Sequence, residues 1–234
     1  MSKIVWDAIG EHRYETGVDH AVLYQVNNSG AYVDGVAWNG ITSASESPSG
    51  AEAQKQYADN MNYLTLYSAE EFGLTVEAFT YPEEFEQNDG SAQPVDGLSL
   101  GQQPRKSFGL CYRTKIGDDV KGDDAGYKLH LVYGCRAAPS ERGYSTINDS
   151  PEAITFSWEI STTPVQVAGF EPTSLLTIDS TKFTATADKA KLTALENILY
   201  GTDAASGETG TGTAPRMPLP MEVMTTLGYT APQS

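Results

Sequence analysis

Short segments of alternating apolar and polar residues, separated by Gly, Asn, Asp and Pro, run through most of the chain. Such alternation is typical of antiparallel β-strands with one buried face. It predicts strands over residues 21–26, 32–38, 63–67, 74–81, 107–116, 127–136 and 154–160. The first two strands flank the sequence Asn-Asn-Ser-Gly, which predicts a hairpin turn because Asn and Gly tolerate positive φ. The chain is therefore predicted to be mainly β.

The clearest strand is 154–160, in which Ile154, Phe156, Trp158 and Ile160 are expected to face inward. The strands 107–116 and 127–136 flank an acidic segment, which predicts a hairpin with a wide, solvated tip.

The only two cysteines, Cys111 and Cys135, lie in the two strands of this hairpin. If the strands pair symmetrically about Gly122, Cys111 lies opposite a position near residue 133. A disulfide to Cys135 would then need a register slip. We therefore expect both cysteines to be ordinary small strand residues.

One segment has helical periodicity. Leu192, Leu195, Ile198 and Leu199 form an apolar stripe that predicts a helix at about 188–200, which Gly201 ends. Residues 202–214 have the composition of a flexible linker, and 218–224 predict a short helix opened by proline. The predicted division is a β domain with its flanking helix over 1–200, followed by a linker and C-terminal segment over 201–234.

Two polar stretches interrupt the strands. Residues 39–60 contain a possible capping box, Ser49 and Glu52, but an extended loop leading into a strand is favoured over a helix there. Residues 83–106 are acidic and are predicted to be a loop.

Charge narrows the functional classes. The chain has 15 Lys and Arg against 31 Asp and Glu, a formal net charge of -16, so it lacks the cations with which proteins grip nucleic acid. No run reaches the roughly 18 apolar residues of a membrane span, and the first residues do not form a signal-peptide core. With only two cysteines, we expect folding in a reducing cytoplasm and no membrane partner.

Candidate chemistry is sparse. His12, His20 and His130 are scattered, and His130 is expected to be a partly exposed strand residue. The acidic hairpin tip lacks the spacing of a calcium loop, and the sequence contains no nucleophile elbow, zinc-protease motif or phosphate-binding loop. We therefore expect no enzymatic activity, no catalytic or metal-binding residues and no cofactor.

A series of segments resembles the major tail proteins (tail tube proteins) of long-tailed, non-contractile bacteriophages. In chain order they are VAWNGITS (36–43), ESPSGAE (46–52), YADN (57–60), EEFGLTVE (70–77), YPEEF (81–85), YKLHLVYG (127–134), PEAITFSWE (151–159) and APRMPLPMEV (214–223). The resemblance covers most of the chain and is weakest over 168–186.

The resemblance implies a β-sandwich or barrel with a flanking helix, whose sheet joins neighbouring subunits into a closed channel. It implies hexameric rings that stack into the hollow tail tube of the virion, assembled in the host bacterial cytoplasm, through which DNA passes without specific binding. The implied partners are further copies of the chain and the tape-measure, tail terminator and tail-tip proteins.

The resemblance also implies that the 39–60 segment contacts the adjacent ring. Candidate residues for this contact are Glu46, Glu52, Lys55, Tyr57 and Asp59.

The sheet containing residues 74–81 and the strands around 107–136 is expected to line the channel, with Glu77 as a lumen-facing acid. Alternatively, the negative charge lies mainly on the outer wall and aids solubility.

A second hypothesis is a monomeric carbohydrate-binding β-sandwich on a virion or cell surface. It would use Trp38 or Trp158 as a stacking platform. The register of Trp158 with Phe156 and Ile160 argues instead that this tryptophan lies in the core.

Overall fold

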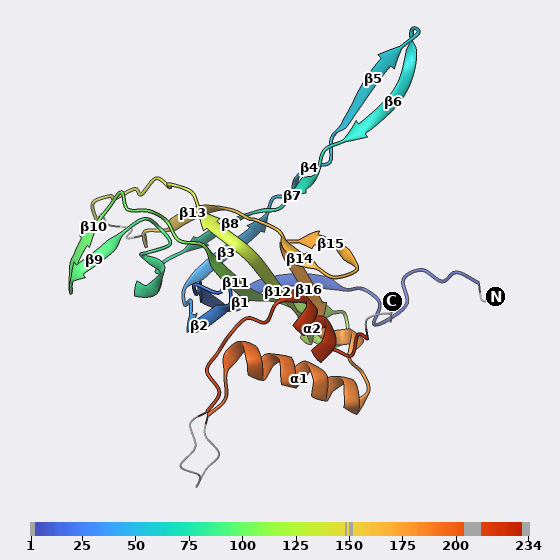
Figure 1. Ribbon diagram of the computed structural model, residues 1–234. Coiled ribbons are helices and arrows are strands. Elements are labelled where there is room, and N and C mark those ends of the chain that lie inside the picture. The colour runs from blue at the N-terminus through green and yellow to red at the C-terminus, as the bar shows by residue number, and fades with distance from the viewer. Residues whose placement is uncertain (1–2, 148, 150–151, 204–211, 231–234) are drawn as a thin grey trace.

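The computed structural model describes residues 3–147, 149, 152–203 and 212–230 of the 234-residue chain. A β-rich body lies above helix α1 (Thr186–Tyr200), and the short helix α2 (Pro220–Thr226) packs nearby (Figure 1). Several segments project from this body, the longest of them a β-hairpin (Figure 1). The prediction of a mainly β protein with a flanking helix is confirmed.

The strands of the main sheet follow the order β2-β1-β11-β12-β13-β8-β3, and β16 also pairs with β12. Their bounds are β1 (Tyr14–Val26), β2 (Tyr32–Ala37), β3 (Ile41–Glu46), β8 (Gly73–Ala78), β11 (Phe108–Asp118), β12 (Gly122–Ala137), β13 (Phe156–Ser161) and β16 (Leu175–Asp179). The smaller strands form two-stranded pairs: β4 (Ser49–Gly50) with β7 (Glu70–Glu71), β5 (Ala53–Ala58) with β6 (Met61–Tyr67), β9 (Ala92–Val95) with β10 (Leu98–Leu100), and β14 (Val165–Val167) with β15 (Phe170–Thr173).

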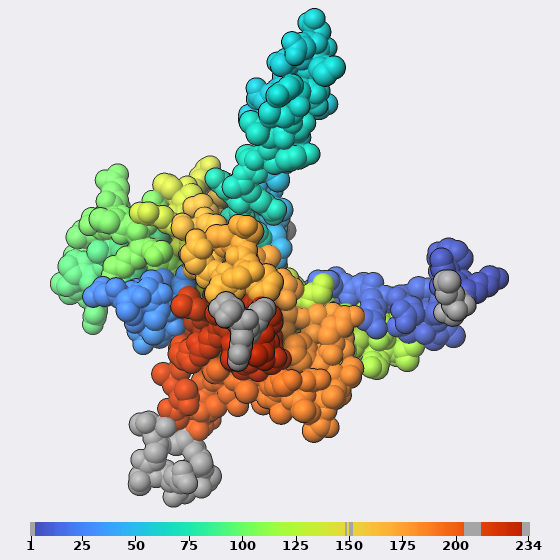
Figure 2. All heavy atoms as spheres, turned by 45° about the vertical axis from the view of Figure 1, so that its right-hand side comes forward, coloured from blue at the N-terminus to red at the C-terminus, as the bar shows by residue number. Residues whose placement is uncertain are grey.

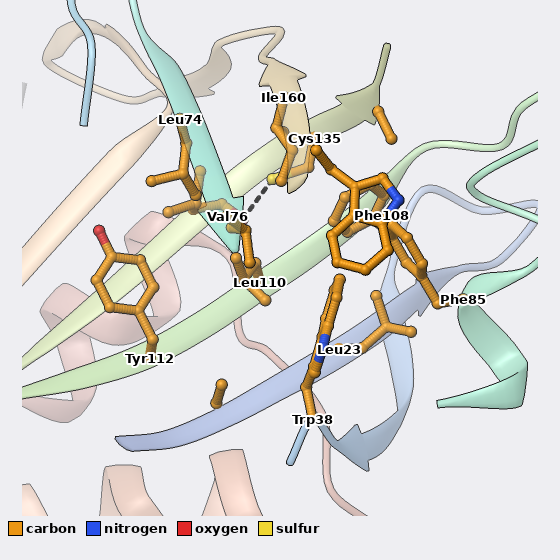
Figure 3. Close-up of a cluster of buried hydrophobic side chains, with 14 of the residues drawn as sticks. Leu23, Trp38, Leu74, Val76, Phe85, Phe108, Leu110, Tyr112, Cys135 and Ile160 are labelled. Atoms are coloured by element: carbon orange, nitrogen blue, oxygen red, sulfur yellow. Dashed lines mark hydrogen bonds between the residues drawn. The ribbon is translucent and has the colours of Figure 1, made fainter. Parts of the chain in front are cut away.

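The main sheet consists of two layers joined at one corner. β12 pairs with β13 only through Arg136 with Ser161 and Ala137 with Ile160. The layer β3–β8–β13 therefore packs across the layer β1–β11–β12. Apolar side chains of both layers meet in one core cluster, as expected for a β-sandwich (Figure 3).

Aromatic rings fill the centre of this first cluster. The Trp38 ring lies 4.5 Å from the Phe85 ring and 5.5 Å from the Trp158 ring, measured between centroids. The Trp38 indole nitrogen donates to the carbonyl of Thr80 at 3.0 Å, which satisfies its one polar group. Phe85 comes from a short 3₁₀ turn (Glu83–Phe85) inside the segment predicted to be a loop.

A second cluster lies on the other face of β1–β11–β12, beneath α1 and the C-terminal segment. Leu192, Leu195 and Leu199 of α1 are buried there, as the helical stripe predicts. Met217 and Val223 pack into the same cluster. The Tyr24 hydroxyl donates to the Leu199 carbonyl and the Tyr133 hydroxyl to the Pro218 carbonyl, which fastens both segments to the sheet. Residues 204–211 of the predicted linker lie outside the described residues.

The two cysteines are free and buried, and they lie in different clusters. Cys111 belongs to the cluster under α1, whereas Cys135 belongs to the cluster between the two sheet layers. Cys111 pairs with Leu131 and Cys135 with Phe108, so the predicted partner near residue 133 is wrong by two positions. Irregularities in the ladder shift the register from a symmetric hairpin.

Three expectations about local structure are corrected. The tip of the β11–β12 hairpin is narrow, because Asp118 pairs with Gly122 and its carboxylate accepts from the amide of Val120. The last long strand begins at Phe156, and Ile154 is exposed before it. The segment 83–106 contains the strand pair β9–β10 as well as loops.

Candidate assembly interface

The most prominent surface feature is the β5–β6 hairpin, here called the arm, which extends well beyond the body (Figures 1 and 2). It accounts for residues 53–67, which include the predicted strand 63–67 and part of the predicted 39–60 loop. Among the described strands, β5 and β6 pair only with each other. A two-stranded hairpin alone is marginally stable in water, so such an arm gains stability when another surface covers it.

Both faces of the arm carry apolar side chains. The cross-strand register places Tyr67 and Thr65 beside Ala53 and Lys55 on one face, and alternation along β5 adds Tyr57 to that face. The opposite face carries Leu64 and Leu66 beside two glutamines, and the register shift leaves Tyr63 as the extra residue of β6. The large apolar and aromatic residues among these are exposed: Tyr57, Tyr63, Leu64, Leu66 and Tyr67. An exposed surface of this kind is typical of an interaction site.

Two positions of the arm have special backbone conformations: its turn, and its base at the β4–β7 pair, here called the root. Asp59 and Asn60 both have positive φ, as the two central residues of a type I′ turn require. At the root, Gly50 pairs with Glu70 and has a φ of 84°, and a Cβ there would lie 2.3 Å from the carbonyl oxygen of Ala69. This crossing requires glycine, since any larger residue would collide with backbone.

Glu46 lies at the end of β3, immediately before this root, and binds to the body. Its carboxylate accepts a hydrogen bond of 2.6 Å from the Tyr112 hydroxyl. His130, which stacks on Tyr112, lies next to the same carboxylate. His130 is buried, contrary to the predicted partial exposure, because Tyr112 and Glu46 cover it.

The structure separates the predicted ring-contact residues into two groups. Lys55, Tyr57 and Asp59 lie together on the exposed arm, and exposed Glu52 immediately precedes it. Glu46 instead lies at the end of β3, before the root of the arm, and its carboxylate is hydrogen-bonded to Tyr112 of the same chain. The Ala-Asp-Asn-Met sequence at 58–61 was the signal that could have identified the hairpin, since it places two turn-forming residues between two strands.

The outer face of the β3–β8–β13 layer is polar. Thr75 and Glu77 alternate with the buried Leu74, Val76 and Ala78. Their cross-strand neighbours on this face are Ser43, Ser45, Ser157 and Glu159. The Ser43 hydroxyl donates to the Glu77 carboxylate at 3.0 Å. This face therefore presents hydroxyls and carboxylates.

The strands β11 and β12 do not present such a face over residues 108–112 and 129–133. Both of their faces are buried there, because one faces the β3–β8–β13 layer and the other faces α1. The expectation that this stretch lines a channel is therefore wrong.

The two edge strands of the main sheet, β2 and β3, differ in whether another segment lies along their outer edge. The C-terminal segment lies along β2, where the Gly35 amide donates to the Pro215 carbonyl and the Met217 amide to the Tyr32 carbonyl. Among the described strands, β3 pairs only with β8, so its other edge carries no strand. An uncovered edge is able to pair with a strand of another subunit.

The N-terminal segment and the β9–β10 pair are further exposed apolar projections. The segment before β1 binds the tip of β11–β12, since the Gly10 amide and His12 both contact the Asp119 carboxylate. Burial raises the pKa of Asp119, but hydrogen bonds from its own amide and from the amide of Gly10, together with His12, lower the pKa below its ordinary value. The exposed apolar side chains of the two projections are Ile4, Val5, Trp6, Ile9, Val95, Leu98 and Leu100.

In the described part of the chain, the residues considered for metal or sugar binding do not form a binding site. Within the described residues, no three His, Cys, Asp or Glu side chains are arranged to hold a metal ion. Trp38 and Trp158 are buried, so the prediction that either forms a sugar-stacking platform is wrong. A pocket of about 540 Å³ contains His20 and Tyr200, but the histidine side chain pairs with Asp19. No helix in the described part of the chain has the length and apolar character needed to cross a membrane.

Comparisons with known proteins give a likeness to solved structures alone. No known protein family matches the sequence, and no curated protein is found as a relative. Among solved structures, the chain is similar to a chain of "Cryo-EM structure of the anti-feeding prophage (AFP) baseplate, 6-fold symmetrised". The sequence identity is 10%, the TM-score is 0.35, and the match covers 75% of this chain and 97% of that chain. A likeness this weak carries no argument about function.

Proposed function

We propose that this protein is a structural virion component that self-assembles into stacked hexameric rings, forming the hollow tail tube of a long-tailed phage. The observation that carries the proposal is the arm, whose two apolar faces are exposed in the single chain. A projection of this kind gains stability by docking on another subunit. The resemblance of ordered sequence segments to tail tube proteins agrees with this role.

In the proposed ring, the uncovered edge of β3 pairs with the neighbouring subunit, and the polar face of β3–β8–β13 lines the channel. Sheet closure removes an edge that would otherwise promote irregular aggregation. Glu77 and Glu159 would then face the DNA. Carboxylates repel phosphates, so DNA passes along such a wall without binding.

The protein acts by assembly and carries out no enzymatic reaction in this proposal. Its partners are further copies of itself and the tape-measure, tail terminator and tail-tip proteins. It works in the virion, after assembly in the host bacterial cytoplasm. The carbohydrate-binding alternative is not pursued, because both tryptophans that would serve it are in the core.

The test is negative-stain electron microscopy of the purified full chain, concentrated at low and at moderate salt. Salt is varied because subunits with a formal charge of -16 repel one another most strongly at low ionic strength. We expect rings or hollow tubes of uniform width at moderate salt. Dispersed monomers at every salt and protein concentration would contradict self-assembly.

A variant in which a short Asn-Gly turn replaces residues 52–68 tests the arm. It should remain folded, because the β4–β7 pair brings the two ends of the deletion together, and it should not form tubes. Asn60→Gly is the matched control, since it keeps the arm and a turn-compatible residue. Normal tubes from the deletion variant would contradict the role of the arm.

A further inference from the structure

A groove of about 730 Å³ lies at the foot of the arm, between the arm root and the β14–β15 hairpin. Figure 1 shows β7, β14 and β15 in this region. Its apolar lining comes from Phe72, Pro164, Pro172 and Leu175. The groove is therefore built from two segments far apart in the sequence, and it has the apolar floor that an aromatic side chain requires.

Two polar features of the groove lack partners within the described part of the chain. The hydroxyl of Ser174 lines the groove and is buried, at 5% exposure of the residue, yet it has no hydrogen-bond partner. A buried hydroxyl without a partner is costly and rare. Glu70 and Glu171 also line the groove, and neither forms an ion pair with a described residue. Among the described residues, the groove thus has an apolar floor, two carboxylates without an ion pair and one buried hydroxyl without a hydrogen-bond partner.

One face of the arm has the complementary chemistry. Lys55 is the only cationic residue in the arm and lies beside Thr65 on the face that also carries Tyr57 and Tyr67. Both tyrosines are exposed. Each supplies an aromatic ring for an apolar surface and a hydroxyl for a polar one.

We propose that the groove of one copy receives the Lys55 face of the arm of a second copy, with Lys55 beside Glu70 and Glu171. The tyrosine rings pack on the apolar floor. This inference rests on the proposed function, because it names the docking site for the arm. The partner is a second copy of this chain, because the cation, the tyrosines, the carboxylates and the apolar floor are all on this chain.

The geometry favours contact between copies over contact within one chain. The arm points away from its own foot (Figures 1 and 2), and the β4–β7 pair with Gly50 fixes its direction. The arm and the groove are different surfaces, so the contact is heterologous and repeats from copy to copy.

Cross-linking of two full-length variants tests the contact directly. Lys55→Cys and Glu171→Cys are mixed at high protein concentration and treated with a short bis-maleimide. We expect a covalent dimer in the mixture and in neither variant alone, because Cys111 and Cys135 are buried. Lys121→Cys, at the exposed tip of β11–β12, mixed with Glu171→Cys is the matched control and should give no dimer. Absence of the dimer from the first mixture would overturn the proposal.

Charge reversal gives an independent readout. We expect Lys55→Glu to raise the protein concentration needed for assembly at least about tenfold, since it places like charges together. The combined variant Lys55→Glu, Glu70→Lys, Glu171→Lys should assemble as readily as the wild type. Lys121→Glu is the control for loss of one cation.

The outcomes separate this inference from the proposed function. Hollow wild-type tubes together with normal assembly of Lys55→Glu would contradict the groove contact and leave the tube intact. Cross-linked chains that form only solid filaments would support the groove contact and contradict the tube.

Discussion

The Nδ1 atom of His130 lies 3.0 Å from Oε1 of Glu46 and so links a central strand of the sheet to the foot of the arm. The imidazole stacks on Tyr112 at a centroid distance of 4.7 Å, and its Nε2 atom lies 3.0 Å from the Thr114 hydroxyl. The carboxylate of Glu46, at the end of β3 on the segment that leads to the arm, is therefore hydrogen-bonded by Tyr112 of β11 and approached by His130 of β12.

This arrangement predicts a specific loss of stability in acid. Burial lowers the pKa of His130 from 6.5, and the nearby carboxylates of Glu46 and Glu15 oppose the shift, while Lys128 adds to it. The unfolded chain therefore takes up a proton at a higher pH than the folded protein. The free energy of unfolding should fall as the pH decreases below about 6.5. Well above that pH, His130 should not contribute to the pH dependence of the free energy of unfolding.

Urea unfolding of wild type and His130→Gln at several pH values between about 7.5 and 5.5 measures this effect. The wild type should lose up to about 1.4 kcal/mol per pH unit more than the variant. Parallel pH profiles would show that His130 does not titrate differently in the two states.

Removal of the Tyr112 hydroxyl should weaken the fold. Tyr112→Phe deletes the hydrogen bond to Glu46 and keeps the buried ring. We expect the free energy of unfolding to fall by about 1.5–3 kcal/mol, as is usual for a hydrogen bond to a charged group. Tyr63→Phe on the exposed arm is the control and should change stability by less than about 0.5 kcal/mol. Equal effects of the two substitutions would contradict this view of the arm foot.

Two glycines with almost the same φ predict very different effects of alanine. Gly134 has a φ of 61° and Gly122 a φ of 60°, so both substitutions incur similar backbone strain, about 1 kcal/mol. A Cβ at Gly134 would lie 2.2 Å from the Thr163 carbonyl oxygen, whereas at Gly122 nothing lies within 4 Å. Gly134→Ala should therefore cost at least about 2 kcal/mol more than Gly122→Ala in thermal or urea unfolding. Similar costs would mean that the Thr163 backbone moves aside easily.

The arm should exchange its backbone hydrogens quickly in the isolated subunit. Its two strands pair only with each other and lie away from both core clusters, so local opening requires little free energy. Hydrogen–deuterium exchange measured by mass spectrometry should show fast exchange over residues 53–67 and slow exchange over β11. In assembled particles the arm should become protected, and unchanged fast exchange there would contradict docking.

Much of the fold could be predicted because its strands follow simple patterns. Leu74, Val76 and Ala78 alternate with Thr75 and Glu77, and the structure buries the first set and leaves the second on the outer face. The leucine stripe of α1 likewise matched its buried face. In both elements, the apolar pattern within one short segment is sufficient to predict which face is buried.

Most of the remaining features depend on contacts between distant segments. Of the arm, only the strand 63–67 was predicted, because residues 53–58 contain one large apolar side chain, Tyr57, and show no apolar alternation. The burial of His130 depends on Glu46, a residue of another strand far away in the sequence. β8, β13 and α1 together cover both faces of β11 and β12 over residues 108–112 and 129–133, which explains why the channel assignment failed for this stretch.

The placement of the two cysteines provides natural reporters of unfolding. Burial raises the pKa of the Cys111 thiol to about 12 and also raises that of Cys135, so neither is reactive in the intact fold. Cys111 becomes accessible when α1 and the C-terminal segment detach, and Cys135 when the two sheet layers separate. The order in which a thiol reagent labels them would therefore show which layer of the molecule opens first, without any change to the sequence.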